Sequence, residues 1–290
     1  MKGFGFENAS SIEEAVSLLD KYKERAMVVA GGTNVMPNIH AGIVDGVTLI
    51  NIRGIGDLKG IRFENGVITV GALTTIHEIG KSEIIKEHAG ALYMAAQVFA
   101  DPTTCHTATI GGNNANASPD ADTAAPLIAL NASVNVQSVR GTRVIPIDDF
   151  YTGVRENSLK PDELILSFSF APSKSAYYKL GQRKSMSVSL AGAAAAVELD
   201  KDETVRYVRI GMGAVAPKTI RAVNAEKALM GKKLTAETFA AMGEALQNDI
   251  DPWEGNLRAS QQYLRDISPV CVKRAVKLAV YGECSYGEAE

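Results

Sequence analysis

The chain has 290 residues, of which 46% are hydrophobic and 22% are charged, and its formal net charge is −3 at pH 7. This composition is typical of a folded globular protein with a sizeable core and two or three subdomains. Lysine and arginine form no long run, which excludes an electrostatic surface for nucleic acid, and no apolar stretch is long enough to span a bilayer. We therefore expect a cytoplasmic protein that binds neither nucleic acid nor membrane.

The first sixty or so residues predict a compact β-α-β-like unit. Ser10 or Ser11 can cap a helix, and a following glutamate can complete a capping box. Residues 27–30 are typical of a short buried strand that ends in a glycine loop, and residues 47–52 predict a second strand.

This first glycine pair is Gly31-Gly32, which is not the G-x-G-x-x-G pattern of a Rossmann fold. Met36-Pro37-Asn38 is expected to prevent a helix from starting immediately afterwards. A pyrophosphate site built on a helix N-terminus is therefore disfavoured. For one such loop taken alone, a tight turn in a sheet protein is an alternative interpretation.

The following residues predict a hairpin, with strands at 60–63 and 67–70 joined by an Asn-Gly turn, and then a helix over 90–100. A second glycine loop comes next, followed by the remaining expected elements of this half. These are a helix at 120–130, strands at 133–139, 143–147 and 164–170, and a linker at 171–175.

The last third predicts a hairpin and three helices. Residues 191–199 are rich in alanine, but the turn-like residues after them favour one arm of a hairpin with 205–212. The helices are expected at 220–230, 235–247 and 268–280. The whole pattern predicts an α+β protein in two parts that divide near residue 173.

The second glycine pair, Gly111-Gly112, stands about eighty residues after the first. Glycines allow backbone N–H groups to approach a diphosphate closely and permit positive φ angles that turn several amides toward one anion. Two such loops, each flanked by hydroxyl and amide side chains, predict a dinucleotide that is held from two sides.

Val29-Ala30-Gly31-Gly32-Thr33-Asn34 followed by Thr109-Ile110-Gly111-Gly112-Asn113 resembles the FAD-binding subunit of the molybdenum hydroxylases. That family includes the flavin (medium) subunits of xanthine dehydrogenase-type and carbon monoxide dehydrogenase-type enzymes, and the resemblance covers the whole chain. It implies a PCMH-type (p-cresol methylhydroxylase-type) FAD-binding domain over 1–173, with two α+β subdomains at about 1–57 and 58–173. A C-terminal flavoprotein domain of a small antiparallel sheet and helices would follow over 174–290.

The resemblance also implies which residues contact FAD. The first segment would hold the diphosphate mainly through backbone amides, and the second would do so from the opposite side, with side-chain hydrogen bonds from Thr109 and Asn113. Neither catalytic side chains nor metal ligands are expected. The complete implied set is Ala30, Gly31, Gly32, Thr33, Asn34, Val35, Phe99, Thr109, Ile110, Gly111, Gly112, Asn113, Asp122, Ile165 and Lys179.

Four of these residues have both an implied role and an alternative one. Asp122 would bind polar groups of FAD, or serve as a carboxylate at a helix N-terminus. Phe99 and Ile165 would pack near the flavin, or belong only to the core. Lys179 would be a cation that stabilises the reduced flavin, or a solvated surface lysine.

The chain also departs from the family. Relatives commonly carry Q-I-R-N before the second segment, where this chain has Thr103-Thr104-Cys105-His106, so any contact of that arginine is lost. Cys105 and His106 could tune the flavin, or be an inert thiol and a satisfied loop histidine. Asn34 stands where relatives often have an acid.

Metal centres are expected on other polypeptides. An iron–sulfur cluster normally needs four thiolates, whereas Cys105, Cys271 and Cys284 are too few and form no C-x-x-C pair. The four histidines show no metal-ligand spacing. The resemblance implies a large partner subunit with molybdopterin and a small partner with [2Fe–2S] clusters, whose electrons this chain would pass through FAD to NAD⁺ or another acceptor.

FAD is expected to be bound non-covalently, because Thr33-Asn34 occupy the loop position where related folds place a residue that reacts with flavin. One alternative is a stand-alone flavin reductase of the UDP-N-acetylmuramate reductase type, which would need a proton-donating serine such as Ser185, Ser187 or Ser189. Another is a scaffold that keeps the fold without flavin.

Overall fold

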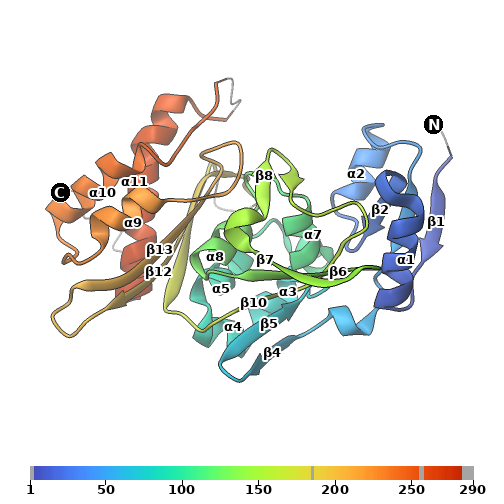
Figure 1. The fold of residues 1–290 in the computed structure, drawn as a ribbon. Helices are drawn as coiled ribbons and strands as arrows, with labels where there is room; N and C mark the ends of the chain where they lie inside the picture. The colour runs from blue at the N-terminus through green and yellow to red at the C-terminus, as the bar shows by residue number, and fades with distance from the viewer. Residues whose placement is uncertain (1–2, 184–185, 255–257, 283–290) are drawn as a thin grey trace.

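The computed structural model describes residues 3–183, 186–254 and 258–282 of the chain. Figure 1 shows three regions in chain order: an N-terminal sheet in blue, a central sheet with helices in cyan and green, and a C-terminal sheet and helix layer in yellow to red. The α+β architecture predicted from the sequence is confirmed. Cys284 and Ser185 lie outside the described residues.

The N-terminal region is a three-stranded parallel sheet in the order β1-β3-β2. Helix α1 begins after Ser11, whose side chain accepts a hydrogen bond from the Glu14 amide, so the predicted cap is confirmed. Strand β1 was missed by sequence analysis because its residues are largely exposed, Phe6 at 59%. The elements are β1 (Gly5–Asn8), α1 (Ile12–Tyr22), η1 (Lys23–Arg25), β2 (Ala26–Val29), α2 (Val35–His40), β3 (Thr48–Asn51) and η2 (Gly56–Leu58).

Helix α2 corrects one expectation: it begins at Val35, only three residues after Gly32, although Pro37 was expected to prevent this. Pro37 is the third helical residue, and amides in the first turn have no acceptor within the helix. A proline there therefore removes no helical hydrogen bond. The helix is nevertheless only six residues long.

The central region is a five-stranded antiparallel sheet in the order β4-β5-β10-β6-β7. The hairpin predicted at the Asn-Gly turn is confirmed, since Asn65 and Gly66 have φ angles of 52° and 76°. The strands are β4 (Ile61–Glu64), β5 (Val67–Gly71), β6 (Ser133–Ser138), β7 (Gly141–Pro146), β10 (Leu164–Phe170) and the separate pair β8 (Tyr151–Gly153) and β9 (Glu156–Asn157).

Short helices pack with this sheet around a core that includes Leu92, Ile110, Phe150 and Phe168. The helix expected at 120–130 begins only at Ala124, and the second glycine pair lies inside a helix rather than in a loop. The helices are α3 (Ile76–Lys81), α4 (Glu83–His88), α5 (Gly90–Gln97), α6 (Pro102–Thr107), α7 (Ile110–Ala115), α8 (Ala124–Ala129) and η3 (Ile147–Asp149).

The C-terminal region is an antiparallel sheet in the order β11-β12-β13-β14 with three helices. The predicted hairpin of β12 and β13 is confirmed. Two helix predictions need correction: residues 220–221 pair with β13 instead of starting a helix, and α11 begins at Gln261 rather than at 268. The elements are β11 (Ser175–Gly181), β12 (Ser189–Leu199), β13 (Val205–Gly213), β14 (Ile220–Arg221), α9 (Val223–Leu229), α10 (Ala236–Leu246) and α11 (Gln261–Tyr281).

The high alanine content of strand β12 follows from its burial on both faces. Ala193 and Ala195 face the core built with α9, α10 and α11, whereas Ala194 and Ala196 face Ala91 and other alanines of α5 and α8. Both faces of the strand are therefore buried, and only small side chains allow helices to approach from both sides. Alternation of polar and apolar residues is absent for the same reason.

Every helix in the described part of the chain is too short or too polar to cross a lipid bilayer. Within residues 3–183, 186–254 and 258–282, no three histidine, cysteine or acidic side chains gather in an arrangement that could hold a metal ion.

We predict that Phe168→Ala lowers the free energy of unfolding by about 3–5 kcal/mol, because Phe168 is fully buried in the central core and its removal leaves a cavity. The matched control is Phe6→Ala, which removes the same atoms from an exposed edge strand. Denaturant unfolding followed by circular dichroism measures both. Equal losses in the two variants would contradict the assigned core.

Candidate cofactor-binding site

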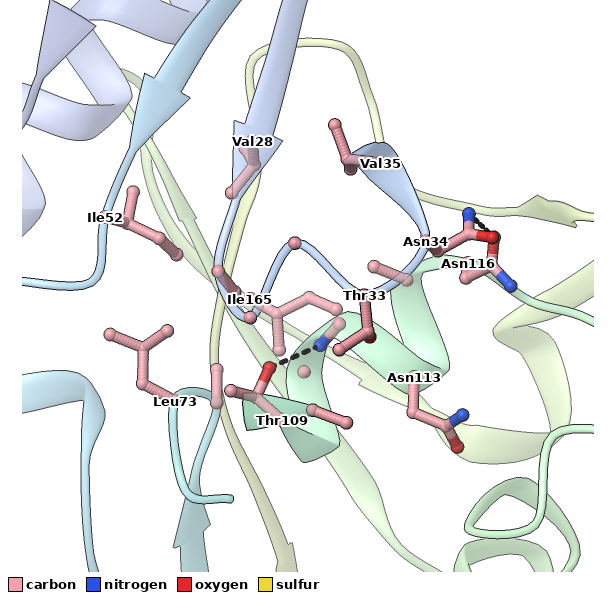
Figure 2. Close-up of a pocket in the computed structure, with 18 of the residues that line it drawn as sticks. Val28, Thr33, Asn34, Val35, Ile52, Leu73, Thr109, Asn113, Asn116 and Ile165 are labelled. Carbon is pink, nitrogen blue, oxygen red and sulfur yellow. Dashed lines mark hydrogen bonds between the residues drawn. The ribbon is translucent and has the colours of Figure 1, made fainter. Parts of the chain in front are cut away.

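A cavity of about 410 Å³ lies between the N-terminal and central regions, and both glycine segments line it. Figure 2 shows Thr33, Asn34, Thr109, Asn113 and Ile165 around this space. Twelve of the fifteen residues predicted from the sequence are in its lining: Ala30, Gly31, Gly32, Thr33, Asn34, Val35, Phe99, Thr109, Gly111, Gly112, Asn113 and Ile165.

The two segments are in direct contact. A Cβ atom added to Gly31 would lie 2.0 Å from the carbonyl oxygen of Thr107, so this position accepts only glycine without movement of the backbone. Asn34 Nδ2 donates a hydrogen bond of 2.7 Å to Asn116 Oδ1, immediately after α7 (Figure 2). Residues about eighty positions apart thus form one continuous wall.

The first segment offers free backbone donors. In the described chain, the amides of Gly31, Gly32, Thr33 and Asn34 have no protein acceptor. Gly32 has a φ of 76°, the left-handed conformation that turns neighbouring amides toward one side. Unpaired donors beside a cavity are suited to an anionic ligand.

The second segment differs from the prediction that its amides also face the ligand. Gly111 N donates to Ala72 O at 2.9 Å, and Gly112 N donates to the Thr109 hydroxyl at 3.0 Å. Neither glycine has a positive φ, and Gly111 is required by close packing, since a Cβ there would lie 2.6 Å from Ala72 O. The segment can therefore offer side chains, notably Asn113, more than backbone donors.

Three predicted residues are not in the lining. Ile110 is fully buried in the central core. Asp122 and Lys179 form an ion pair of 2.7 Å, with side chains only 9% and 7% exposed. The interpretation of Lys179 as a solvated surface residue is therefore wrong.

The Asp122–Lys179 pair lies outside the cavity and is hydrogen-bonded to the backbone of its wall. Lys179 Nζ also donates to the carbonyl of Val98, which precedes the lining residue Phe99. Asp122 Oδ1 accepts hydrogen bonds from Tyr177 and Ser189 of the C-terminal sheet. Burial raises the pKa of Asp122, although Lys179 and both hydroxyl groups favour the carboxylate.

Cys105 and His106, where the family pattern is interrupted, do not line the cavity. The His106 ring stacks on His77 with 3.8 Å between ring centroids. The Cys105 thiol lies 3.4 Å from the carbonyl oxygen of Phe99, and burial raises its pKa. The thiol is accordingly protonated at neutral pH.

Sequence analysis missed Glu163, which lines the cavity although its side chain is only 3% exposed. Arg143 pairs with both of its carboxylate oxygens at 2.7 Å. Glu163 stands directly before the strand predicted at 164–170, and only its pairing with an arginine twenty residues earlier reveals its position.

Two known family patterns together match almost the whole chain. Residues 2–172 match the family described as FAD binding domain in molybdopterin dehydrogenase, and residues 176–279 match the CO dehydrogenase flavoprotein C-terminal domain. The chain belongs to the family of molybdopterin dehydrogenase FAD-binding proteins. The recognition made from the two glycine segments is confirmed, and the oxidoreductase class with it.

Similar proteins cover nearly the whole chain. The xanthine dehydrogenase FAD-binding subunit of Escherichia coli O157:H7 is 31% identical over 95% of this chain and 95% of its own length. The nicotinate dehydrogenase FAD-subunit of Eubacterium barkeri is 34% identical over 86% of this chain and 87% of its own. A solved carbon monoxide dehydrogenase chain from Hydrogenophaga pseudoflava superposes with a TM-score of 0.91 at 31% identity, covering 97% of this chain and 98% of that one.

The residues present fit FAD. The free amides of the first segment suit a diphosphate, and Phe99, Leu73 and Ile165 supply apolar surface for rings. The two segments touch at Gly31 and Thr107, and the cavity beside this contact stays open.

We predict that Gly31→Ala weakens FAD retention and lowers the free energy of unfolding by about 1–3 kcal/mol, because the added methyl group must push Thr107 away. Gly54→Ala is the control, since a Cβ at Gly54 meets nothing within 4 Å. The ratio of flavin absorbance to protein absorbance after gel filtration, together with thermal unfolding, measures the difference. Unchanged flavin content in Gly31→Ala would contradict a contact essential to the site.

We also predict that Asp122→Asn destabilises the protein by about 3–5 kcal/mol, because it leaves the buried Lys179 ammonium without its counter-charge. The double variant Asp122→Asn/Lys179→Met removes both charges and should recover most of the loss. Chemical denaturation of the two variants tests this coupling. If the double variant is no more stable than the single one, the pair does not act as a unit.

Proposed function

We propose that this chain is the FAD-binding subunit of a multi-subunit molybdopterin-dependent dehydrogenase or hydroxylase. The single observation that carries the proposal is the cavity whose wall joins two distant glycine segments and presents unpaired backbone donors. The relatives named as FAD subunits and medium chains support an assembly with a large molybdopterin subunit and a small [2Fe–2S] subunit. In that assembly the chain accepts electrons from the iron–sulfur partner and passes them to NAD⁺ or another acceptor, in the cytoplasm.

Each part of the wall has a proposed role. The amides of residues 31–34 bind the diphosphate, and Thr109 and Asn113 add side-chain hydrogen bonds from the other side. Phe99 and Ile165 pack against the rings of the cofactor. The proposed influence of Asp122 and Lys179 is exerted through Val98, to which Lys179 is bonded.

When bound, FAD supplies hydride transfer and single-electron exchange, so this chain needs no acid–base or nucleophilic side chain. Its residues bind the cofactor, orient its rings and exclude water. None of the described lining residues is a histidine, tyrosine or cysteine, which supports non-covalent binding.

We propose that the flavin-binding domain ends near residue 173 and that the C-terminal domain follows from 174. The two family matches meet between residues 172 and 176, which supports this division. Ion pairs of Asp148 with Arg209 and Arg221, together with Asp122–Lys179, would then fix one domain on the other.

The alternative of a stand-alone reductase needs a serine beside the flavin. Ser189 is buried and donates to Asp122, and the Ser187 hydroxyl lies 3.2 Å from the carbonyl of Val188. The described lining of the cavity contains no serine. These contacts favour the subunit assignment.

We predict that the chain purified alone binds FAD, shows the flavin absorbance near 450 nm, and catalyses no substrate-dependent hydroxylation until large and small partners are added. Heat or acid should release intact FAD. Colourless protein that takes up no added FAD would favour the scaffold alternative. Flavin that stays on the chain in a denaturing gel would overturn non-covalent binding, and hydroxylation without partners would overturn the subunit assignment.

A further inference from the structure

Glu163 is the single ionisable side chain among the described residues that line the cavity. A site for a diphosphate is expected to offer donors or cations, so a carboxylate in its wall is unusual. Like charges repel strongly in a water-poor site. A carboxylate beside the cavity therefore favours a part of the cofactor that lies away from the phosphates and that donates hydrogen bonds.

The carboxylate is held in one position. Arg143 Nε donates to Oε1 at 2.7 Å, Arg143 Nη2 donates to Oε2 at 2.7 Å, and the Lys160 amide donates to Oε2 at 2.8 Å. Burial raises the pKa of Glu163, but the hydrogen bonds from Arg143 and Lys160 outweigh it and the pKa ends below its ordinary value. The group is ionised at neutral pH.

One acceptor position remains open. Two carboxylate oxygens can accept about four hydrogen bonds, and the protein supplies three. The Arg140 guanidinium lies 3.8 Å from Oε1, beyond hydrogen-bond distance, and its bonds go to Asp162 instead. Oε1 therefore keeps one acceptor position that the described part of the chain does not fill.

The lining beside Glu163 along the chain is apolar. Leu159, Leu164 and Ile165 line the cavity, and Leu164 belongs to the hydrophobic cluster against which Val28 of β2 packs. Apolar walls around one fixed acceptor suit a flat heterocycle with one amino group at its edge. Adenine has this chemistry. Isoalloxazine suits it less, because its edge donor N3–H lies between two carbonyl oxygens that would oppose the carboxylate. Ile165 would then pack beside the adenine, whereas the family resemblance implied a position near the flavin.

We propose that Glu163 accepts a hydrogen bond from the exocyclic amino group of the FAD adenine, and that it makes the site select adenine over bases with a carbonyl at the same position. This inference rests on the proposed FAD site. In the same pose, guanine and hypoxanthine would turn the carbonyl oxygen at position 6 toward the carboxylate, and their N1–H would reach it only if the base shifted. Arg143 is the positioning residue that holds the carboxylate from behind.

The test compares two ligands on three forms of the full chain, stripped of flavin. FAD and flavin hypoxanthine dinucleotide differ at position 6, which is an amino group or a carbonyl, and at the adjacent N1, which carries a hydrogen only in hypoxanthine. Affinities are measured by quenching of flavin fluorescence. The wild-type chain should prefer FAD by about 10- to 100-fold, the range for a hydrogen bond to a charged group, and Glu163→Gln should reduce this preference to less than about 3-fold.

Asp162→Asn is the matched control. Asp162 is the carboxylate next to Glu163 in the chain. It is buried and paired with Arg140, and it does not line the cavity. Its replacement removes one charge and one ion pair, as Glu163→Gln does, so it should cost stability while keeping the wild-type preference. Circular dichroism verifies that each variant is folded.

The outcomes distinguish failure of the adenine contact from failure of the FAD site. If the wild-type chain binds both ligands equally, or if Glu163→Gln keeps the full preference, the adenine contact is refuted while the FAD site stands. Should Glu163→Gln fail to fold, equal affinity of the wild-type chain for the two ligands would still refute the contact. A wild-type chain that binds neither ligand refutes the proposed function itself.

Discussion

The contact between Gly31 and the Thr107 carbonyl is the constraint on which the site depends. It brings the end of β2 against the turn between α6 and α7, with no room for any side chain. Because the two backbones meet there, the residues on either side of the contact become opposite walls of one cavity. The hydrogen bond from Asn34 to Asn116 holds the same two segments together on the other side. An anion between them meets donors whose positions are already fixed.

The two walls contribute different chemistry. The first glycine segment keeps its amides unpaired, whereas helix α7 uses its own amides against Ala72 and Thr109. Helix α7, whose amides are paired, therefore supports residues 31–34, which carry the free donors. Binding in a preorganised site of this kind costs little ordering of the backbone, which favours tight retention of a large cofactor.

The C-terminal region is fixed to the wall by both packing and charge. The alanines of strand β12 are buried on both faces of its sheet, so the sheet cannot shift without opening two cores. The Asp122–Lys179 pair joins the same sheet to the carbonyl before Phe99. A shift of the C-terminal sheet would therefore be transmitted to the cavity through the carbonyl of Val98. Arg143 has a comparable role on the other side, since it holds Glu163 in the lining from outside the cavity.

Local features were predictable from the sequence by itself: the capped helix after Ser11, the Asn65-Gly66 hairpin, and the paired glycines that identify the family. Each depends on residues close together in the chain, where side-chain chemistry and backbone conformation act directly. Only the tertiary structure decided that the second glycine pair is helical, that Lys179 is buried against Asp122, and that Glu163 lines the cavity. Those outcomes depend on which distant surfaces meet, because a partner across the core determines whether an amide or a charge is satisfied by protein or left for a ligand.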